Sequence, residues 1–381
     1  MEQSLESQPQ GTFYSHLTEV LLRNACQLQT ENTDTYRFPH RSGGHPISKW
    51  KAKLLESVQR RGFAYFRQVN LEEILTNFHS VNVHGSGLQQ LHAMLSDEHS
   101  RATLVDVMAY RILGEERMKL PLNGQRYWNA IHRIENELMV QPKTISVPVL
   151  DGSLNLYSLR SSGFPICIHA HLLNILNTFL LQQYRYASHH TTVAVSPGDI
   201  VIDGGGCWGD TALYFAQLAG SHGNVYCFEF APDNLSILKR NLEMNPLLRD
   251  RIDVIKEALW DKTGDTISFD SAGPGTTVGE TAEQSCKVTT RAIDDFVEEK
   301  RLDRVDFIKM DIEGAELKAL QGAADTIRKF RPKLAISLYH KLEDFACIPE
   351  FLANINVPYQ FFLDHFTIHQ EETVLFALPV N

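Results

Sequence analysis

The stretch GDIVIDGGGCWGDT, residues 198–211, decides how the chain folds. The apolar run Ile200 to Ile202 is typical of a buried parallel strand, and Asp203 stands at its carboxyl end. The glycines that follow let the backbone turn sharply and approach a ligand closely, and apolar residues at helical spacing over 211–218 predict a helix after the turn. A strand, a glycine turn and a helix N-terminus in this order predict a site for a nucleotide-like cofactor.

The glycines admit two interpretations. Gly204, Gly206 and Gly209 spell GxGxxG, and Glu229 lies 20 residues beyond the last of them, which is the spacing of a dinucleotide-binding loop. Asp203 favours the other interpretation, because a carboxylate beside the first glycine would face a pyrophosphate but can accept hydrogen bonds from a cofactor that carries an amino group. Read as acid-x-Gly-x-x-x-Gly, the loop resembles the first motif of S-adenosylmethionine methyltransferases.

Predicted strands and helices alternate from about residue 195 onward, which indicates a doubly wound, mostly parallel α/β sheet. The predicted parallel strands lie at 199–203, 224–229, 252–256, 305–310 and 333–339, and the predicted helices at 211–219, 233–244, 292–300 and 314–329. The end of the chain, PYQFFLDHF and then TVLFALP, predicts a hairpin at the sheet edge, so a seven-stranded sheet is expected. The stretch 271–285 is predicted to be an inserted flexible loop.

The part of the chain before this sheet is predicted to be mainly helical. Between residues 51 and 131, apolar residues recur at intervals of three and four residues, and they include Leu54, Leu55 and Val58. A further helix is expected through 127–138.

A connecting segment is expected between the helices and the sheet. Residues 144–168 predict two strands joined by a two-residue turn at Asp151-Gly152, then a short strand, and a helix follows from His171 to Tyr186. The predicted division is a helical region at 1–143, a connecting segment at 144–194 and a cofactor domain at 195–381.

Composition narrows the class of protein. A chain of 381 residues with 43% hydrophobic content can bury a sizeable core in more than one unit. The net charge of -10 weighs against a protein that covers phosphate backbones, so we expect no nucleic-acid partner and favour a small-molecule or glycan acceptor. The six cysteines form no CxxC pair, and no apolar stretch reaches 18 residues; these features predict a cytoplasmic protein with reduced cysteines, no signal peptide and no membrane span. A homo-oligomer stays open.

Residues at the ends of the predicted strands are candidates for binding a cofactor. Glu229 ends the second strand, where a carboxylate can accept both hydroxyls of a ribose, and Asp261 after the third strand is a candidate for an exocyclic amine. Asn241 and Asn245 are expected on the outer surface of the following helix or near its C-cap. The candidate cofactor-binding residues are Asp203, Gly205, Gly209, Asp210, Glu229, Ala258 and Leu259.

The stretch FIKMDIEGAEL at 307–317 is the most unusual in the chain, because an apolar strand here contains Lys309 and has acids at its exit. Asp311 is expected beneath the point where a cofactor methyl group would emerge. Three roles are open to Asp311, Glu313 and Glu316: a general base for a hydroxyl, ligands for a divalent cation, or ion-pair partners of Lys309 that only shape the turn. Asp311 and Glu313 are the metal candidates.

His340 follows the fifth predicted strand at the same edge and is a second base candidate, because histidine takes and returns a proton near neutral pH. His365, in the turn between the last two strands, is expected to approach it. The candidate catalytic residues are therefore Asp311, His340 and Lys309. His169 and His171 alternate on one strand face, but a metal site is not expected there, since no third ligand is near.

Four segments together resemble the FkbM-type family of S-adenosylmethionine-dependent methyltransferases: DGGGCWGDT, CFEFAPDN, KMDIEGAEL and the run from RPKLAISLYHK to ETVLFALP. The resemblance covers roughly 195–379, and 96–128 is similar to a helical extension of some members. It implies a class I methyltransferase fold that uses S-adenosylmethionine to methylate a hydroxyl of a sugar, glycan or secondary metabolite. Cys207 and Trp208 replace a small polar and an aliphatic residue of many members, and Trp208 is expected to cover the methionine side of the cofactor.

Two other functions stay open. The literal glycine string allows an NAD-dependent oxidoreductase, and a non-catalytic scaffold would keep the fold and dock a partner on the N-terminal helices. The need for a divalent cation is also left open.

Overall fold

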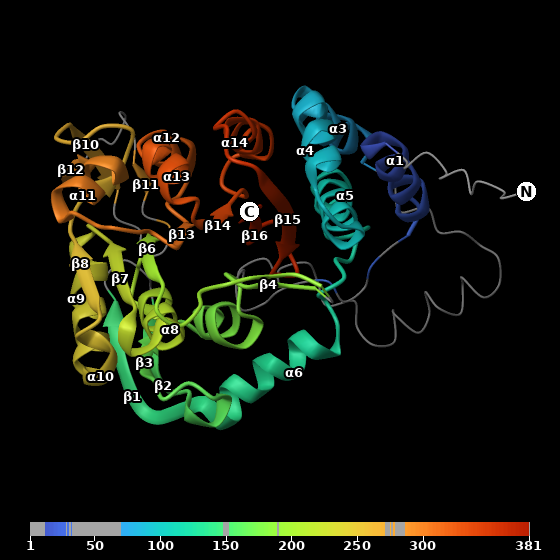
Figure 1. Cartoon of the computed structure of the whole chain (residues 1–381). Coiled ribbons are helices and arrows are strands. Elements are labelled where there is room, and N and C mark those ends of the chain that lie inside the picture. Colours follow the sequence, from blue (N-terminus) through green and yellow to red (C-terminus); the bar gives the residue numbers. More distant parts are fainter. Residues whose placement is uncertain are drawn as a thin grey trace, which may run out of the picture.

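The computed structural model describes residues 12–27, 29, 32, 70–147, 152–188, 190–270, 275, 277–278 and 286–380. Its central sheet consists of β6 (Ile200–Gly204), β7 (Asn224–Phe228), β8 (Ile252–Ile255), β13 (Phe307–Met310), β14 (Lys333–Ser337), β15 (Tyr359–His365) and β16 (Thr373–Pro379). The spatial order is β15-β16-β14-β13-β6-β7-β8 (Figure 1). Five strands pair in parallel, and β16 runs antiparallel to both neighbours. The predicted doubly wound, seven-stranded sheet is confirmed.

The two faces of this sheet carry separate apolar cores, as a parallel sheet covered on both sides requires. Val201 and Phe307 belong to one core, whereas their chain neighbours Ile202 and Ile308 belong to the other. The helices that follow the strands are α8 (Asp210–Ala219), α9 (Pro232–Glu243), α10 (Pro246–Arg249), α11 (Ile293–Lys300), α12 (Glu316–Gln321), α13 (Ala324–Phe330) and α14 (Asp344–Ala353).

The single helix predicted over 314–329 is wrong, because the chain breaks between α12 and α13 at Gly322. A Cβ atom on Gly322 would lie 2.1 Å from the carbonyl oxygen of Trp260, so the backbones approach each other there more closely than a side chain allows. Helix α14 was not predicted; its sequence DFACIPEFLA includes Pro349.

A second, four-stranded sheet lies between β8 and α11. It has the order β11-β10-β12-β9 and comprises β9 (Ala258–Leu259), β10 (Thr266–Asp270), β11 (Thr277–Val278) and β12 (Cys286–Arg291). The flexible loop predicted over 271–285 is wrong at residues 277–278, which form a strand. Most of the remaining loop lies outside the described residues.

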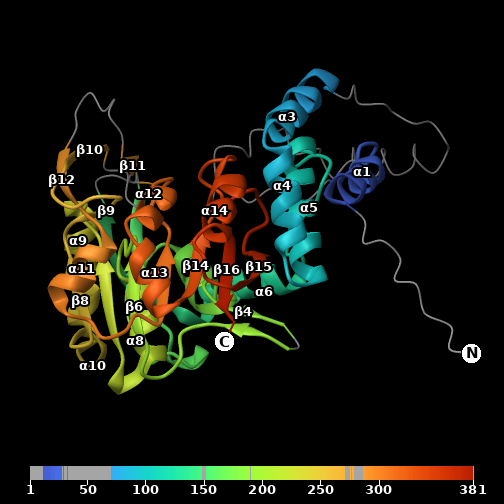
Figure 2. The same ribbon diagram turned by 45° about the horizontal axis from the view of Figure 1, so that its top comes forward.

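The N-terminal helices cover the edge of the large sheet. They are α1 (Phe13–Asn24), α3 (Leu71–Val83), α4 (Gly85–Met94) and α5 (Glu98–Leu113), and both Figure 1 and Figure 2 show α4 and α5 beside α14 and β15. Leu95 forms a parallel bridge with Phe361, and the Ser100 hydroxyl accepts a hydrogen bond of 2.9 Å from the amide of Leu363. These contacts occupy polar groups that an edge strand would otherwise expose.

The predicted helical layer is thus confirmed where the structure describes it, whereas Leu54, Leu55 and Val58 lie outside the described residues. The helix predicted through 127–138 consists of α6 (Gln125–Arg133) and a π-helical turn at Ile134–Leu138. Throughout the described ranges, no helix is both long and apolar enough to cross a membrane. All six cysteines are unpaired.

The connecting segment forms a three-stranded antiparallel sheet of β1 (Met139–Val147), β2 (Gly152–Ser158) and β3 (Cys167–Ala170). The predicted turn is wrong at Gly152, because Gly152 already belongs to β2 and pairs with Val147, and Asp151 lies outside the described residues. Helix α7 (Leu172–Asn174) continues as the π-helix η4 (Ile175–Leu181). It ends at Gln182, whose φ of 55° is left-handed, so the predicted helix stops before Tyr186. The division of the chain at 143 and 194 stays a prediction.

Asn241 of α9 and Asn245 join this connecting sheet to the helices on the large sheet. The predicted surface position is wrong for both, because both are buried, whereas Asn245 does lie next to the C-cap of α9, as the other alternative predicted. Asn241 is fully buried; its Oδ1 accepts from the His169 amide at 2.8 Å, and its Nδ2 donates to the carbonyls of His169 and Trp208 at 2.9 and 2.8 Å. Asn245 pairs in the same way with both backbone groups of Cys167. Four residues of helix rise about 6 Å and two of strand about 6.6 Å, so the two amides match the free edge of β3.

We expect Asn241→Ala to lower the free energy of unfolding by about 3 kcal/mol, because it leaves buried backbone groups of β3 without partners. Urea unfolding measures the loss. Lys239→Ala on the exposed face of the same helix is the control and should change stability by less than about 0.5 kcal/mol. Equal effects of the two substitutions would contradict the docking role of Asn241.

Candidate active site

A cavity lies at the carboxyl edge of the large sheet. Its lining includes four of the predicted cofactor residues, Gly205, Glu229, Ala258 and Leu259. Asp311 and Glu313 also line it. The other predicted site residues, namely Asp203, Gly209, Asp210, Lys309 and His340, are not among its described lining residues.

The glycine loop fits closely against the end of β13. Gly205 has a φ of 81°, and a Cβ atom there would lie 2.0 Å from the carbonyl oxygen of Asp311, so only glycine fits. The amides of Gly205 and Gly206 both donate to the carbonyl of Phe228 at 3.0 Å. Gly209, with a φ of 85°, is the N-cap of α8. The loop therefore has one available backbone path, which passes along the cavity.

Asp203 and Lys309 form a buried ion pair behind this loop. They are register partners on β6 and β13, both are 1% exposed or less, and Lys309 Nζ lies 3.2 Å from Asp203 Oδ1. Lys309 Nζ also donates to the carbonyls of Gly204 and Gly205 at 2.9 and 2.7 Å, and Thr211 donates to Asp203 Oδ2 at 2.7 Å. The pair thus holds the loop, and a direct contact of Asp203 with a cofactor stays a prediction.

The ammonium group stays charged in this position. Burial opposes protonation of Lys309, but the negative charges of Asp203, Asp311 and Asp210 outweigh burial and raise its pKa.

Asp210 joins the loop to the connecting segment. Its Oδ2 accepts hydrogen bonds from Thr178 at 2.7 Å and from Asn174 at 3.4 Å, and burial raises its pKa. These contacts give Asp210 a structural role. Its role in cofactor binding stays a prediction. Trp208 does not cover the cavity as expected, because it is fully buried in the core.

Glu229 presents a fixed carboxylate to the cavity. Oε1 accepts from the amides of Phe230 and Ala231 at 2.7 and 2.8 Å, and Oε2 accepts from Asn234 at 3.3 Å. Burial raises the pKa of this carboxyl, while the donated hydrogen bonds favour its ionised form.

Beyond β8, the cavity wall differs from the prediction. Ala258 and Leu259 line it, but Asp261 is not a lining residue and instead accepts a bond of 2.8 Å from Lys318. The acid that does line the wall is Glu257, which binds Arg291 through two hydrogen bonds of 2.8 and 3.2 Å.

Two tyrosine hydroxyls fix the Asp311 carboxylate. Tyr184 donates to Oδ2 at 2.7 Å and Tyr339 to Oδ1 at 2.9 Å, while Lys309 Nζ lies 5.1 Å from the centre of the Tyr184 ring. Burial opposes ionisation of Asp311, yet the charges of His340 and Lys309 and the two hydroxyls lower its pKa. Neither tyrosine was predicted as a site residue: Tyr184 lies outside every motif, and Tyr339 directly precedes His340.

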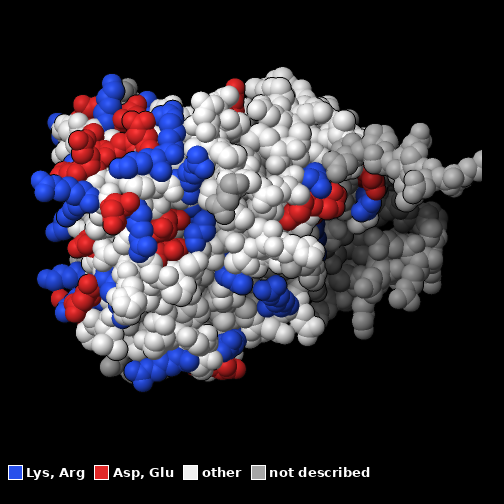
Figure 3. Space-filling view, viewed as in Figure 1, with Lys and Arg blue, Asp and Glu red and all other residues white. Residues whose placement is uncertain are grey.

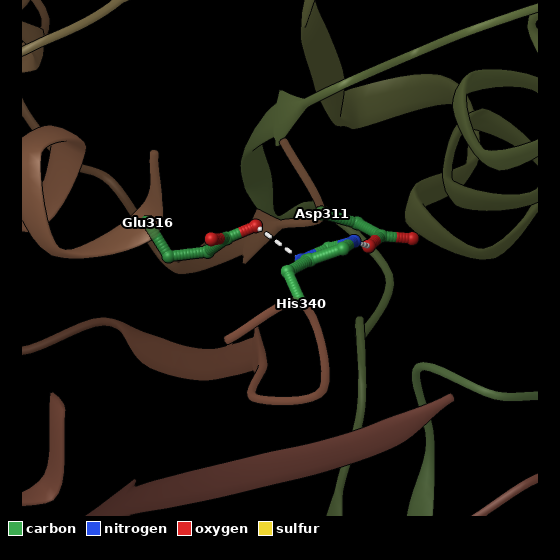
Figure 4. Close-up of side chains that lie close together, drawn as sticks. All are labelled: Asp311, Glu316 and His340. Atoms are coloured by element: carbon green, nitrogen blue, oxygen red, sulfur yellow. Dashed lines mark ion pairs between the residues drawn. The ribbon is translucent and has the colours of Figure 1, made fainter. Parts of the chain in front are cut away.

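His340 lies between carboxylates on both sides of its ring (Figure 4). Nδ1 is 3.0 Å from Glu316 Oε1, whereas Nε2 is 3.4 Å from Asp311 Oδ1 and 3.5 Å from Glu313 Oε2. Burial opposes protonation, but the contacts with Glu313 and Glu316 and the charges of Glu316 and Asp311 raise the pKa of His340 to about 11. The raised pKa favours the imidazolium form of His340 at neutral pH, and its predicted role as a base stays a prediction.

Asp311, Glu313 and Glu316 lie within ion-pair distance of His340. The partner in their predicted ion-pair role is therefore His340 and not Lys309. His365 pairs with Thr373, its Nδ1 lying 2.8 Å from the Thr373 hydroxyl oxygen, and this contact places it in the β15–β16 hairpin.

We expect Lys309→Met to lower the free energy of unfolding by about 3–5 kcal/mol, because it leaves the Asp203 carboxylate buried without a counter-charge. Chemical denaturation measures the loss, and Lys318→Met, at a half-exposed pair, should cost less than about 1 kcal/mol. The double variant Asp203→Asn/Lys309→Met should recover part of the lost stability. A double variant less stable than Lys309→Met would count against the ion pair.

Comparison with known proteins agrees with this geometry. Residues 191–364 match the family model of the methyltransferase FkbM domain. The 2-O-methyltransferase NoeI of Sinorhizobium fredii (strain NBRC 101917 / NGR234) is 29% identical over 154 residues, 35% of this chain and 61% of that relative. The chain therefore matches less than two thirds of this curated relative's length.

A solved structure shows the same fold. The crystal structure of methyltransferase FkbM from Methylobacillus flagellatus KT has a TM-score of 0.52 and 20% identity, covering 86% of this chain and 70% of that chain. The fold is that of the class I methyltransferases, and residues 191–364 of this chain match the model of the methyltransferase FkbM domain.

Proposed function

We propose that the protein is an S-adenosylmethionine-dependent methyltransferase and that it methylates a hydroxyl group of a sugar, glycan or secondary metabolite. The match to the family model supports methyl transfer, and the name of the similar 2-O-methyltransferase supports oxygen as the acceptor atom. The observation that carries the proposal is the Glu229 carboxylate on the cavity wall beside the Gly205 loop.

The charge of the cavity fits this cofactor. Four acids line it, Glu229, Glu257, Asp311 and Glu313, and no lysine or arginine occurs among its described lining residues. Negative walls favour a cofactor with a sulfonium and an amino group, and they disfavour the pyrophosphate of NAD.

Several residues would hold the cofactor. Glu229 Oε1 is occupied by two backbone amides, so Oε2 is the oxygen that would accept the ribose hydroxyls. Ala258 and Leu259 supply apolar surface for the purine, and Gly205 lets the backbone approach without a side chain. Lys309 keeps this loop in place from behind.

Asp311 is the proposed base at the acceptor side. When bound, the cofactor would supply a methyl group on a sulfonium for transfer to the acceptor oxygen, and the electron pair of the broken carbon–sulfur bond would stay on sulfur. The hydroxyl proton passes to Asp311. A carboxylate of low pKa suffices for this, because the hydroxyl becomes strongly acidic as the new bond forms.

The distribution of charge on the surface agrees with a small acceptor. On the face in Figure 3, lysines and arginines are interspersed with acids around α9 and α11, and the middle of the face carries few charges. This face therefore has no continuous basic strip for a phosphate backbone.

We expect calorimetry to show that Glu229→Gln weakens binding of S-adenosylmethionine and S-adenosylhomocysteine by about 10–100-fold, because the charge-assisted hydrogen bonds to the ribose are lost. Glu243→Gln, an exposed acid on α9, is the matched control and should bind like the unaltered protein. Tighter binding of NAD than of S-adenosylmethionine would overturn the proposal, and binding of none of the three would favour a scaffold.

We expect Asp311→Asn to lower turnover by about 100-fold or more, with cofactor affinity changed little, because the base is lost while the cavity keeps its shape. Mass spectrometry of sugar, glycan and metabolite acceptors incubated with the cofactor detects the added methyl group. Near-normal turnover of this variant would exclude Asp311 as the base.

A further inference from the structure

His340 is a buried ring whose Nε2 lacks a hydrogen-bond partner although carboxylates surround it. Its side chain is 7% exposed, and Nε2 forms no hydrogen bond of normal geometry to any residue in the described part of the chain. The nitrogen–carboxylate separations of 3.4 and 3.5 Å at Nε2 are long for charge-assisted hydrogen bonds, which favour about 2.7–2.9 Å. A buried polar group is normally satisfied, so a ligand between these atoms is expected.

Two carboxylate oxygens lie from Nε2 at the spacing of metal ligands. Metal–ligand bonds of about 2.0–2.2 Å with tetrahedral or octahedral angles place neighbouring ligand atoms about 2.8–3.6 Å apart. The separations from Nε2 to Asp311 Oδ1 and to Glu313 Oε2 agree with this spacing without rearrangement. Asp311 and Glu313 also line the cavity, so further coordination positions would face it.

Glu316 lies on the opposite side of the His340 ring and has a different role. Its Oε1 is 3.0 Å from His340 Nδ1 and also accepts a bond of 2.8 Å from the Ile312 amide, and its side chain is fully buried. Metal-binding histidines commonly turn their second nitrogen toward such a carboxylate, which fixes the tautomer and the ring orientation. Asp311, Glu316 and His340 offer atoms within 4.8 Å of one another, but Glu316 faces Nδ1, on the side of the ring away from Asp311 and Glu313.

The backbone at Glu313 agrees with this arrangement. Its φ of 56° is unusual for a residue other than glycine, and Gly314 follows with a φ of 89°. This turn lets acids two residues apart in the sequence both reach Nε2.

We propose that Asp311, Glu313 and His340 Nε2 bind a divalent cation, with Glu316 as the carboxylate that orients His340. One imidazole and two carboxylates suit first-row ions such as Mn²⁺, Fe²⁺ or Zn²⁺. The binding inference stands on this geometry alone, whereas its meaning for catalysis rests on the proposed function. There, a bound cation would hold the acceptor hydroxyl and lower its pKa.

The test is Mn²⁺ binding to the full chain, followed by the loss of the free-ion electron paramagnetic resonance signal and by calorimetry, with Zn²⁺ in parallel. We expect one equivalent to bind. Glu313→Gln and His340→Asn should each weaken binding at least 10-fold, and Glu316→Gln should weaken it about 10–100-fold. Circular dichroism and thermal unfolding verify that each variant is folded; Glu313→Gln, on a partly exposed turn, keeps the test valid if His340→Asn does not fold.

Glu257→Gln is the matched control, because this acid lines the same cavity but is bound to Arg291. It should leave Mn²⁺ affinity unchanged; a loss equal to that of Glu313→Gln would show only general attraction to acids and would overturn the site. Absence of one-equivalent binding of both ions would also overturn it and would leave a protonated His340 as the partner of the acids. S-adenosylmethionine binding is measured on the same samples, so failure of the cation site and failure of the proposed function are separable.

Discussion

The ion pair between Asp203 and Lys309 is the constraint on which the site depends. A charged pair inside a parallel sheet is costly unless every group is satisfied, and here Lys309 also donates to two carbonyls of the glycine loop. Register pairing of β6 with β13 places the two side chains together, so the sheet positions the lysine and the lysine positions the loop. The same backbone path brings Gly205 against the end of β13, where Asp311 begins the acidic turn.

The site is built from more of the chain than the family segment 191–364. Tyr184 and Thr178 reach Asp311 and Asp210 from the connecting segment, and Arg111 of α5 donates to the carbonyl of Tyr339 at 3.2 Å. The two regions before the large sheet therefore support the groups at its edge. A loss of packing at the N-terminal helices would change the position of Tyr339, and through it the position of the Asp311 carboxylate.

The sequence predicted the large sheet well because a parallel strand buried on both faces appears in the sequence as a continuous apolar run. The glycine loop and the acids at the strand ends were also predictable, because they lie within a few residues of the strands that they follow. It did not predict groups whose role depends on distant partners. Asn241 has the local appearance of a surface residue, and only the free edge of β3 gives its amide a buried function. Tyr184 stands in no motif, and the contact that matters is 127 residues away along the chain. Two strands of the small sheet, β9 and β11, were missed since they have two residues each, too few for a periodic pattern.

The arrangement of charge explains why an acid-lined cavity is tolerated. Among the described residues, three cations lie behind wall acids and not on the wall: Arg291 binds Glu257, and Lys309 and His340 lower the pKa of Asp311. The described hydrogen-bond donors to the Glu229 carboxylate are backbone amides and an asparagine, which favour its charged form. The acids thus line the cavity while these positive groups lie outside it. A field in this direction favours a positively charged ligand, because such a ligand is attracted by the acids without contacting the cations paired with them.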